Sequence, residues 1–151
     1  MATFQPTDPA FESRVRTSFA RQKMMATLGA TLERVAPGEV DVRLPFRADL
    51  TQQHGFLHAG AMTTIVDSAC GYAALTLMPV GAAVLTVEFK VNLMAPGQGD
   101  AIVARGRVLR AGRTLIVCAG DAFALEHGRE KLVLTMLATM MTVRDRPGLS
   151  D

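Results

Sequence analysis

One short stretch, HGFLHAGAMTTIVD at residues 54–67, brings together the residue types that could carry chemistry in this chain. It contains His54, His58 and one carboxylate, Asp67, which is the only formally charged residue between His58 and Glu88. An apolar environment penalises the charged form of a carboxylate and makes it more basic. Asp67 is therefore a candidate nucleophile or general base for a hydrolytic reaction.

The residues after His58 are suited to stabilising negative charge. Ala59 and Gly60 stand at the expected start of an apolar helix over about 59–78. The first turn of a helix has backbone N–H groups that lack partners within the helix, and it is the positive end of the helix dipole. The small side chains at these two positions would let a substrate carbonyl approach the backbone. This start predicts a donor for an oxyanion, as hydrolysis at a carbonyl carbon requires.

The spacing of these two candidates has a consequence for assembly. Ala59 and Asp67 are eight residues apart on one expected helix. A rise of 1.5 Å per residue separates them by ~12 Å along the helix axis. One carbonyl carbon can hardly contact both groups of the same chain. The sequence therefore predicts a homodimer with active sites at its interface, in which each chain supplies a different part.

Plainer interpretations of the same residues remain open. Asp67 could be structural, hydrogen-bonded to Thr63 or Thr64 one turn back. His58 is better explained as a cap that positions the start of the helix than as a group that moves protons. The four-residue spacing of His54 and His58 is found in metal sites, but the intervening Gly55 and the lack of a nearby third ligand argue against a metal. We expect no metal and no cofactor.

The rest of the chain predicts the elements that would position these groups. Asp8 suits an N-cap and Pro9 a first helical position, which predicts a helix over about 9–23. Alternating apolar residues predict a half-buried strand over 40–46. After the central helix we expect four long strands, at about 83–94, 101–109, 114–125 and 131–143.

Glycine-containing turns separate these four strands, which predicts antiparallel hairpins between consecutive strands. A helix that is apolar on nearly all sides must be enclosed by other elements. A curved antiparallel sheet wrapped round the central helix would enclose it. The expected class is thus α+β, with a single domain over residues 1–151.

The segment HGFLHAGAMTTIVDSACGYAA, followed by TVEFKVNLMAPG, resembles the hotdog-fold acyl-CoA thioesterases of the phenylacetate-pathway type. In that family an Asp follows the His at the start of the central helix by nine residues, as Asp67 follows His58 here. The exit of the next strand is Pro96-Gly97. The resemblance runs from about residue 30 to the end and implies a hotdog fold.

The resemblance also implies roles for individual residues. Asp67 would be the nucleophile or base, and the helix start would donate to the oxyanion. The family usually has Gly where this chain has Ala59, but the backbone N–H survives that change. Gln52 stands where relatives typically have Asn. Two roles are equally open for it: a contact to the thioester or to Asp67, or a loop residue with no part in the site. Thr86 corresponds to the family's orienting hydroxyl and could hold the attacking water.

Composition excludes several other classes of protein. The net charge of +2, the absence of Trp and the single Tyr argue against nucleic acid as a partner. The apolar run around Asp67 is long enough to cross a bilayer, but the charge and the break at 78–83 argue against a membrane span. Cys70 and Cys118 fall in apolar segments and are predicted to be buried thiols. With no signal-peptide pattern at the N-terminus, they indicate a cytoplasmic protein.

We therefore expect an acyl-CoA thioesterase that releases free acid and CoA, and that assembles as a homodimer or a dimer-of-dimers tetramer. His54, Arg110 and Arg113 are candidate contacts for the substrate, although the two arginines flank a turn and could simply be solvated. A non-catalytic acyl-CoA-binding protein is an alternative. A hotdog dehydratase or hydratase is less favoured, because it needs a His paired with an acid, and only Tyr72 stands close to Asp67.

Overall fold

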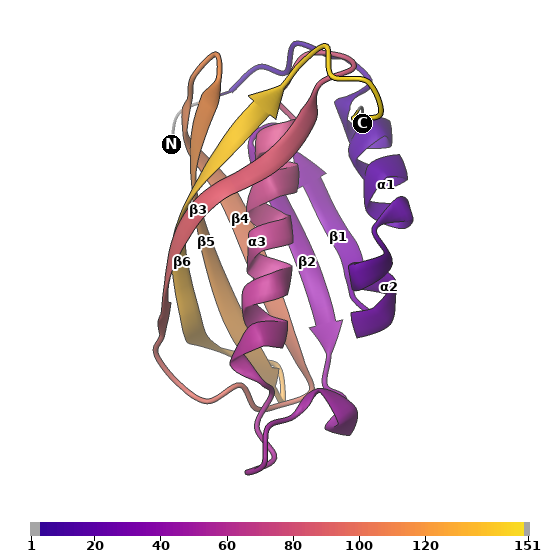
Figure 1. The fold of residues 1–151 in the computed structure, drawn as a ribbon. Helices are drawn as coiled ribbons and strands as arrows, with labels where there is room; N and C mark the ends of the chain where they lie inside the picture. Colours follow the sequence, from indigo (N-terminus) through magenta and orange to yellow (C-terminus); the bar gives the residue numbers. More distant parts are fainter. Residues whose placement is uncertain (1–3, 150–151) are drawn as a thin grey trace.

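The computed structural model describes residues 4–149, which form an antiparallel sheet curved round one long helix (Figure 1). This architecture confirms the expected hotdog fold. Its elements in chain order are α1 (Phe11–Arg21), α2 (Lys23–Leu28), β1 (Thr31–Ala36), β2 (Glu39–Pro45), a short 3-10 helix (Ala48–Leu50), α3 (Ala59–Leu75), β3 (Ala83–Leu93), β4 (Ala101–Ala111), β5 (Leu115–Glu126) and β6 (Arg129–Val143).

The sheet order is β1-β2-β4-β5-β6-β3, with every neighbouring pair antiparallel. The predicted hairpin between 83–94 and 101–109 is therefore wrong. β3 pairs with β6 at one edge, and β4 pairs with β2 and β5. The connecting segment does not turn back on itself, because the Gly97 carbonyl accepts a hydrogen bond from the Leu57 N–H below the start of α3. This crossing lets the sheet close round both sides of the helix.

The central helix is packed tightly against the sheet. Ile65, Val66, Ala69 and Cys70 are fully buried. Two glycines on the strands make this packing possible. A Cβ atom added at Gly106 would lie 2.4 Å from the Ala69 backbone, and one added at Gly120 would lie 2.5 Å from the Val66 side chain. Such distances are too short for any side chain, so these glycines set how closely the sheet approaches α3.

The helix ends differ from the sequence prediction. The predicted helix over about 9–23 is two helices, because Gln22 adopts an extended conformation between α1 and α2. The central helix ends at Leu75 instead of continuing to 78, in keeping with the restriction that Pro79 places on the residue before it. The side chain of Arg14 donates hydrogen bonds to the carbonyls of Leu75, Met78 and Pro79. Arg14 thereby fastens α1 to the C-terminal end of α3.

Strand β1 was not predicted, since its residues are exposed or half-buried and show no clean alternation. Within residues 4–149, no helix is both long enough and apolar enough to cross a membrane.

Candidate active site

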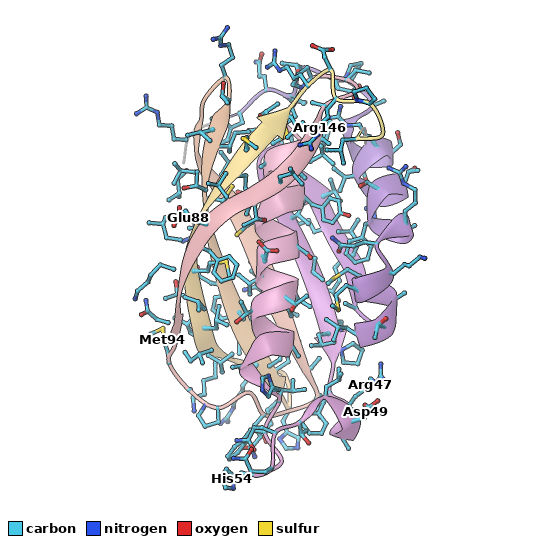
Figure 2. All side chains as sticks on the ribbon, in the orientation of Figure 1. Arg47, Asp49, His54, Glu88, Met94 and Arg146 are labelled. Atoms are coloured by element: carbon cyan, nitrogen blue, oxygen red, sulfur yellow. The ribbon has the colours of Figure 1, made fainter. Side chains whose placement is uncertain are left out.

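Asp67 and Thr86 meet between α3 and β3. The Thr86 hydroxyl donates a hydrogen bond of 2.8 Å to Asp67 Oδ1. Directly after Thr86 the register of β3 shifts before Glu88, which marks a β-bulge. Glu88 lies on the side of β3 away from α3, as Figure 2 shows, and accepts a hydrogen bond from Thr139. Thr86 thus faces the helix, whereas Glu88, two residues further along the strand, faces outward.

The two residues line a pocket of about 420 Å³. Its wall comes from the α1–α2 junction, from α3, from the start of β3 and from the C-terminal segment, and its residues are Ser18, Arg21, Gln22, Asp67, Ser68, Gly71, Tyr72, Ala83, Val84, Leu85, Thr86, Gly148 and Leu149. Burial raises the pKa of the Asp67 carboxyl, and the hydrogen bond from Thr86 acts in the opposite direction. The pocket therefore holds a partly desolvated carboxylate that is more basic than an exposed aspartate.

The structural interpretation of Asp67 named Thr63 or Thr64 as its partner. The Thr64 hydroxyl instead donates to the Gly60 carbonyl at 2.7 Å. The hydrogen-bond partner of Asp67 is Thr86, which comes from a different element. Asp67 is thus held by a contact between α3 and β3. This contact lies outside the helix and does not stabilise the helix itself.

The start of α3 is capped by His58. Its Nδ1 atom accepts a hydrogen bond of 2.9 Å from the Gly60 N–H, which confirms the predicted cap. The Gly60 N–H is consequently occupied in this structure. The Ala59 N–H has no hydrogen-bond partner among residues 4–149. Of the two predicted oxyanion donors, Ala59 is the one that is open to a ligand.

Gln52 lies beside the same helix start. Its side-chain oxygen accepts a hydrogen bond from the His54 N–H, so it shapes its own loop. It also lines a second pocket, of about 400 Å³, together with Phe56, Leu57, Ala59, Met62, Leu93, Met94, Ala95, Pro96 and Gly97. Gln52 and Ala59 are thus brought together, but no hydrogen bond joins Gln52 to Asp67.

The Asp67 pocket and the Ala59 pocket have no lining residue in common. Ala59 lies at the start of α3 (Ala59–Leu75), and Asp67 lies near the middle of the same helix. One chain therefore carries two separate half-sites, one with a carboxylate and one with an open backbone N–H.

Comparison with known proteins places this arrangement in a family. Residues 54–131 match the model of the Thioesterase superfamily, and they include the capped helix start, Asp67 and Thr86. The chain belongs to the Thioesterase superfamily. It is thus a member of a superfamily of thioester hydrolases.

Solved structures agree with this assignment. A thioesterase family protein from Silicibacter pomeroyi is 51% identical, with a TM-score of 0.87 over 89% of this chain and 98% of that one. The PaaI protein from the phenylacetic acid degradation operon of E. coli shares the fold, with a TM-score of 0.80 over 88% of this chain and 93% of that one, at 18% identity.

Curated relatives match over part of their length. Human acyl-coenzyme A thioesterase 13 is 33% identical over 92 residues, which are 60% of this chain and 65% of the human protein. A Halobacterium salinarum protein named as an esterase is 32% identical to this chain over 97 residues, and the match spans 64% of that protein.

The remaining predicted contacts of this thioesterase superfamily member are spread over both ends of the sheet. His54 lies at the same end as the start of α3 (Figure 2) and lines a pocket of about 450 Å³ with Phe56 and His127. Arg110 and Arg113 are exposed at the β4–β5 hairpin, at the opposite end of the sheet from Ala59 (Figure 1). Within one chain, the two arginines therefore do not join His54 or Ala59 in a single site.

Sequence reasoning missed the polar wall of the Asp67 pocket. Ser68 donates a hydrogen bond of 3.2 Å to the side-chain oxygen of Gln22, at the break between α1 and α2. Nothing in the local sequence links these helices to Asp67, since the contact spans 46 residues. The adjacent position of Ser68 and Asp67 was the one available signal.

The two cysteines are poorly suited to act as nucleophiles. Cys70 and Cys118 are free and buried, as predicted, and burial raises the pKa of the Cys118 thiol to about 12. A thiol of that kind does not supply a thiolate nucleophile near neutral pH. In the part of the chain that the structure describes, no three His, Cys, Asp or Glu side chains are grouped so as to hold a metal ion.

Proposed function

We propose that this chain hydrolyses acyl-CoA thioesters, with Asp67 as nucleophile or as general base for water. The observation that carries the proposal is the hydrogen bond between Thr86 and the half-buried Asp67 in a pocket of acyl-group size. An exposed surface aspartate would have neither the raised pKa nor the fixed orientation. The family membership and the likeness to a human acyl-CoA thioesterase support the same reaction.

The reaction assigns a different task to each half-site. The thioester carbonyl oxygen would accept a hydrogen bond from the Ala59 N–H, which stabilises the oxyanion as the tetrahedral intermediate forms. In one route the Asp67 carboxylate would remove a proton from the attacking water, and the CoA thiolate would leave and take up that proton. In the other route the carboxylate would attack the carbonyl carbon and expel CoA, and a water would then hydrolyse the acyl-aspartyl anhydride to give the free acid and restore Asp67. Acyl-CoA and water thus give the free acid and CoA. The acyl group would lie in the pocket beside Asp67.

We propose that the two half-sites meet in a homodimer. β3 is an edge strand of the sheet, and its unpaired edge carries exposed apolar side chains, with Val87 53% and Phe89 43% exposed. A long apolar edge of this kind is a template for pairing with another strand. Antiparallel pairing of β3 with its copy would set the two α3 helices antiparallel, so that the start of one lies near the middle of the other.

The convex face of the sheet supports a dimer of dimers. Leu115 and Leu137 are exposed there, and they alternate with Ile116 and Met136, which are buried against α3. Two such faces could pack together and cover these leucines. The buried free thiols of Cys70 and Cys118 support action in a reducing compartment such as the cytoplasm.

A non-catalytic acyl-CoA-binding role is the second candidate, favoured by one observation. The cap formed by His58 occupies the Gly60 N–H and leaves a single open donor at the helix start. Both candidates predict binding of acyl-CoA, but the catalytic one alone predicts release of free CoA thiol.

A thiol-release assay over a panel of aryl, medium-chain and long-chain acyl-CoA substrates tests the proposal. We expect turnover by the wild type, and a loss of at least about 100-fold in Asp67→Asn, since that side chain can neither attack nor accept a proton. Asn is chosen as the replacement because it keeps the shape of the carboxylate. Equal turnover by the two proteins would exclude Asp67 as the catalytic group. Acyl-CoA binding without any thiol release would favour the binding role.

A further inference from the structure

The Asp67 pocket extends from the carboxylate in one direction. On α3 its wall reaches from Asp67 to Tyr72, which lies ~7.5 Å closer to the C-terminal end of the helix. On β3 the wall reaches from Thr86 back to Ala83, ~10 Å along the strand. β3 starts at the end of the fold where α3 stops, as Figure 1 shows. The pocket therefore leads away from Ala59, toward the C-terminal end of α3.

The segment after β6 meets this pocket at its far end. Val143, the last residue of β6, is the strand partner of Ala83, the pocket residue furthest along β3 from Thr86. The chain then crosses over the C-terminal end of α3 toward α1 (Figure 1). Gly148 and Leu149 line the pocket, and Leu149 is half-buried. These two residues thus form the part of the wall opposite the reacting carboxylate.

A tight turn at residues 146–149 places Leu149 there. The Leu149 N–H donates a 3.0 Å hydrogen bond to the Arg146 carbonyl, which closes the turn. Pro147 occupies the first central position, and Gly148 occupies the second with a φ of 80°. Proline followed by a glycine of positive φ is the signature of a type II β-turn. The position of Leu149 is therefore encoded by the turn that precedes it.

We propose that Leu149 is a specificity-determining residue, which closes the acyl pocket and selects compact acyl groups over long straight chains. This inference rests on the proposed function, which sets the thioester carbon beside Asp67. The acyl group would then extend along the pocket toward Tyr72 and Leu149. A butanoyl group is short enough to end before Leu149. An extended dodecanoyl chain is longer than the pocket wall and would have to displace the leucine.

A purely structural role for Leu149 makes a different prediction. If the leucine only packs the segment after β6 against the fold, its loss should lower Tm and leave chain-length selectivity unchanged. Leu149→Ala opens the end of the pocket, and Leu149→Trp fills it further. Leu109→Ala is the matched control, because Leu109 is 49% exposed on β4 and does not line the pocket.

A second pair of variants acts through the backbone alone. Gly148 and Gly128 have φ values of 80° and 76°, and a Cβ atom added at either glycine would meet no described atom within 4 Å. Alanine at either position therefore brings conformational strain without a clash. Gly148→Ala should disturb the turn that places Leu149 and shift selectivity toward the long chain. Gly128→Ala brings the same strain to the β5–β6 hairpin, outside the pocket, and is the control.

Binding is measured first, by calorimetric titration with S-butyl-CoA and S-dodecyl-CoA, thioethers that cannot be hydrolysed. Leu149→Ala should shift the ratio of the two Kd values about tenfold in favour of dodecyl, as small changes in a hydrophobic pocket typically do. Leu149→Trp should shift the ratio the other way, and both controls should keep the wild-type ratio. No binding by the wild type, an unchanged ratio in both Leu149 variants, or an equal shift in Leu109→Ala would overturn the proposal.

Kinetics provide the second measurement, as thiol release from butanoyl-CoA and dodecanoyl-CoA. The ratio of kcat/KM for dodecanoyl over butanoyl should rise about tenfold in Leu149→Ala. An equal loss for both substrates, together with a lower Tm, would make Leu149 a packing residue and would overturn the proposal. If the wild type hydrolyses neither thioester, the proposed function fails, while the Kd ratios of the thioethers still decide the role of Leu149.

Discussion

The hydroxyl of Thr86 on β3 donates a 2.8 Å hydrogen bond to Oδ1 of Asp67 on α3, and this contact ties the edge strand to the middle of the central helix. It orients the carboxylate and stabilises its charged form, while burial does the opposite. The basicity of Asp67 is thus set by two elements that are close in space and distant in sequence.

Thr86→Val should lower kcat more than it changes KM, because the hydroxyl orients a catalytic group and does not simply bind substrate. It should also raise the pKa of Asp67 further, since the hydrogen bond that favours the carboxylate is lost. The acid limb of the pH profile of kcat/KM should therefore move to higher pH. Thr86→Ser keeps the hydroxyl and should keep the wild-type profile. A rise in KM at constant kcat and an unmoved acid limb would make Thr86 a packing residue.

Asp67→Asn should stabilise the fold near neutral pH. The folded-state pKa of Asp67 is raised by desolvation, so the folded protein holds this proton more tightly than the unfolded chain. Its contribution to stability is greatest at low pH and falls as the pH rises through the raised pKa. The gain in Tm of Asp67→Asn over wild type should thus be present at pH 7 and vanish in acid. A lower Tm at pH 7 would show that the carboxylate has a stabilising structural role.

Mixing two inactive variants should restore activity if the half-sites come from different chains. Asp67→Ala removes the carboxylate, and Ala59→Pro removes the open N–H. Proline suits the first position of a helix, and the extended conformation of His58, with φ −62° and ψ 137°, is the one favoured before proline. In a mixed dimer, one site carries both defects and the other carries neither.

Random exchange of subunits makes half of the dimers mixed, so activity should return to roughly a quarter of the wild-type level. Exchange is followed by mass or by an affinity tag. Complete exchange with no recovery of thioester hydrolysis would show that Ala59 and Asp67 of one chain serve the same site.

Replacement of His58 should separate capping from catalysis. His58→Ala removes the acceptor of the Gly60 N–H and should cost about 1 kcal/mol of stability, as the loss of a helix cap typically does. His58→Asn can accept the same hydrogen bond and should restore the stability, measured by urea denaturation. Both variants should keep most of their kcat. A large loss of kcat in the stable Asn variant would instead assign His58 a direct role in the reaction.

A charge on the edge strand should dissociate the dimer and remove activity together. Phe89→Glu places a carboxylate on the apolar edge of β3, where a second β3 is proposed to pair. Sedimentation should show a smaller species, and thiol release should fall with it. Val80→Glu is the control, because Val80 is 75% exposed and lies in the turn before β3. A monomer that retains full activity would contradict the shared site.

The local sequence was sufficient to locate the central helix and the groups on it. The apolar run with a single charge predicts a buried helix that carries Asp67. The small residues at 59 and 60 predict a helix start whose backbone a substrate carbonyl can approach closely. Both follow from local composition, since burial of a helix on all sides requires an apolar surface on all sides. His58 could be assigned as a cap for the same reason, because a cap acts within one turn of its own residue.

Strand order could not be read in the same way. The Pro96-Gly97 segment has the composition of a hairpin turn, yet it carries the chain across to the other side of the sheet, where β4 pairs with β2. Local turn chemistry does not specify which strand becomes the neighbour, because that choice depends on closing the sheet round α3. The same closure sets β3 at the edge, where its apolar side chains remain exposed.

The sequence by itself determined which groups are candidates for the reaction and, through the rise of the helix, the distance between Ala59 and Asp67. Only the tertiary structure decided what surrounds them: Thr86 as the partner of Asp67, and Ser68 and Gln22 in the pocket wall. The reason is physical. A helix fixes distances along its own axis through local hydrogen bonds, whereas contacts between elements are fixed by packing, which depends on the whole chain at once.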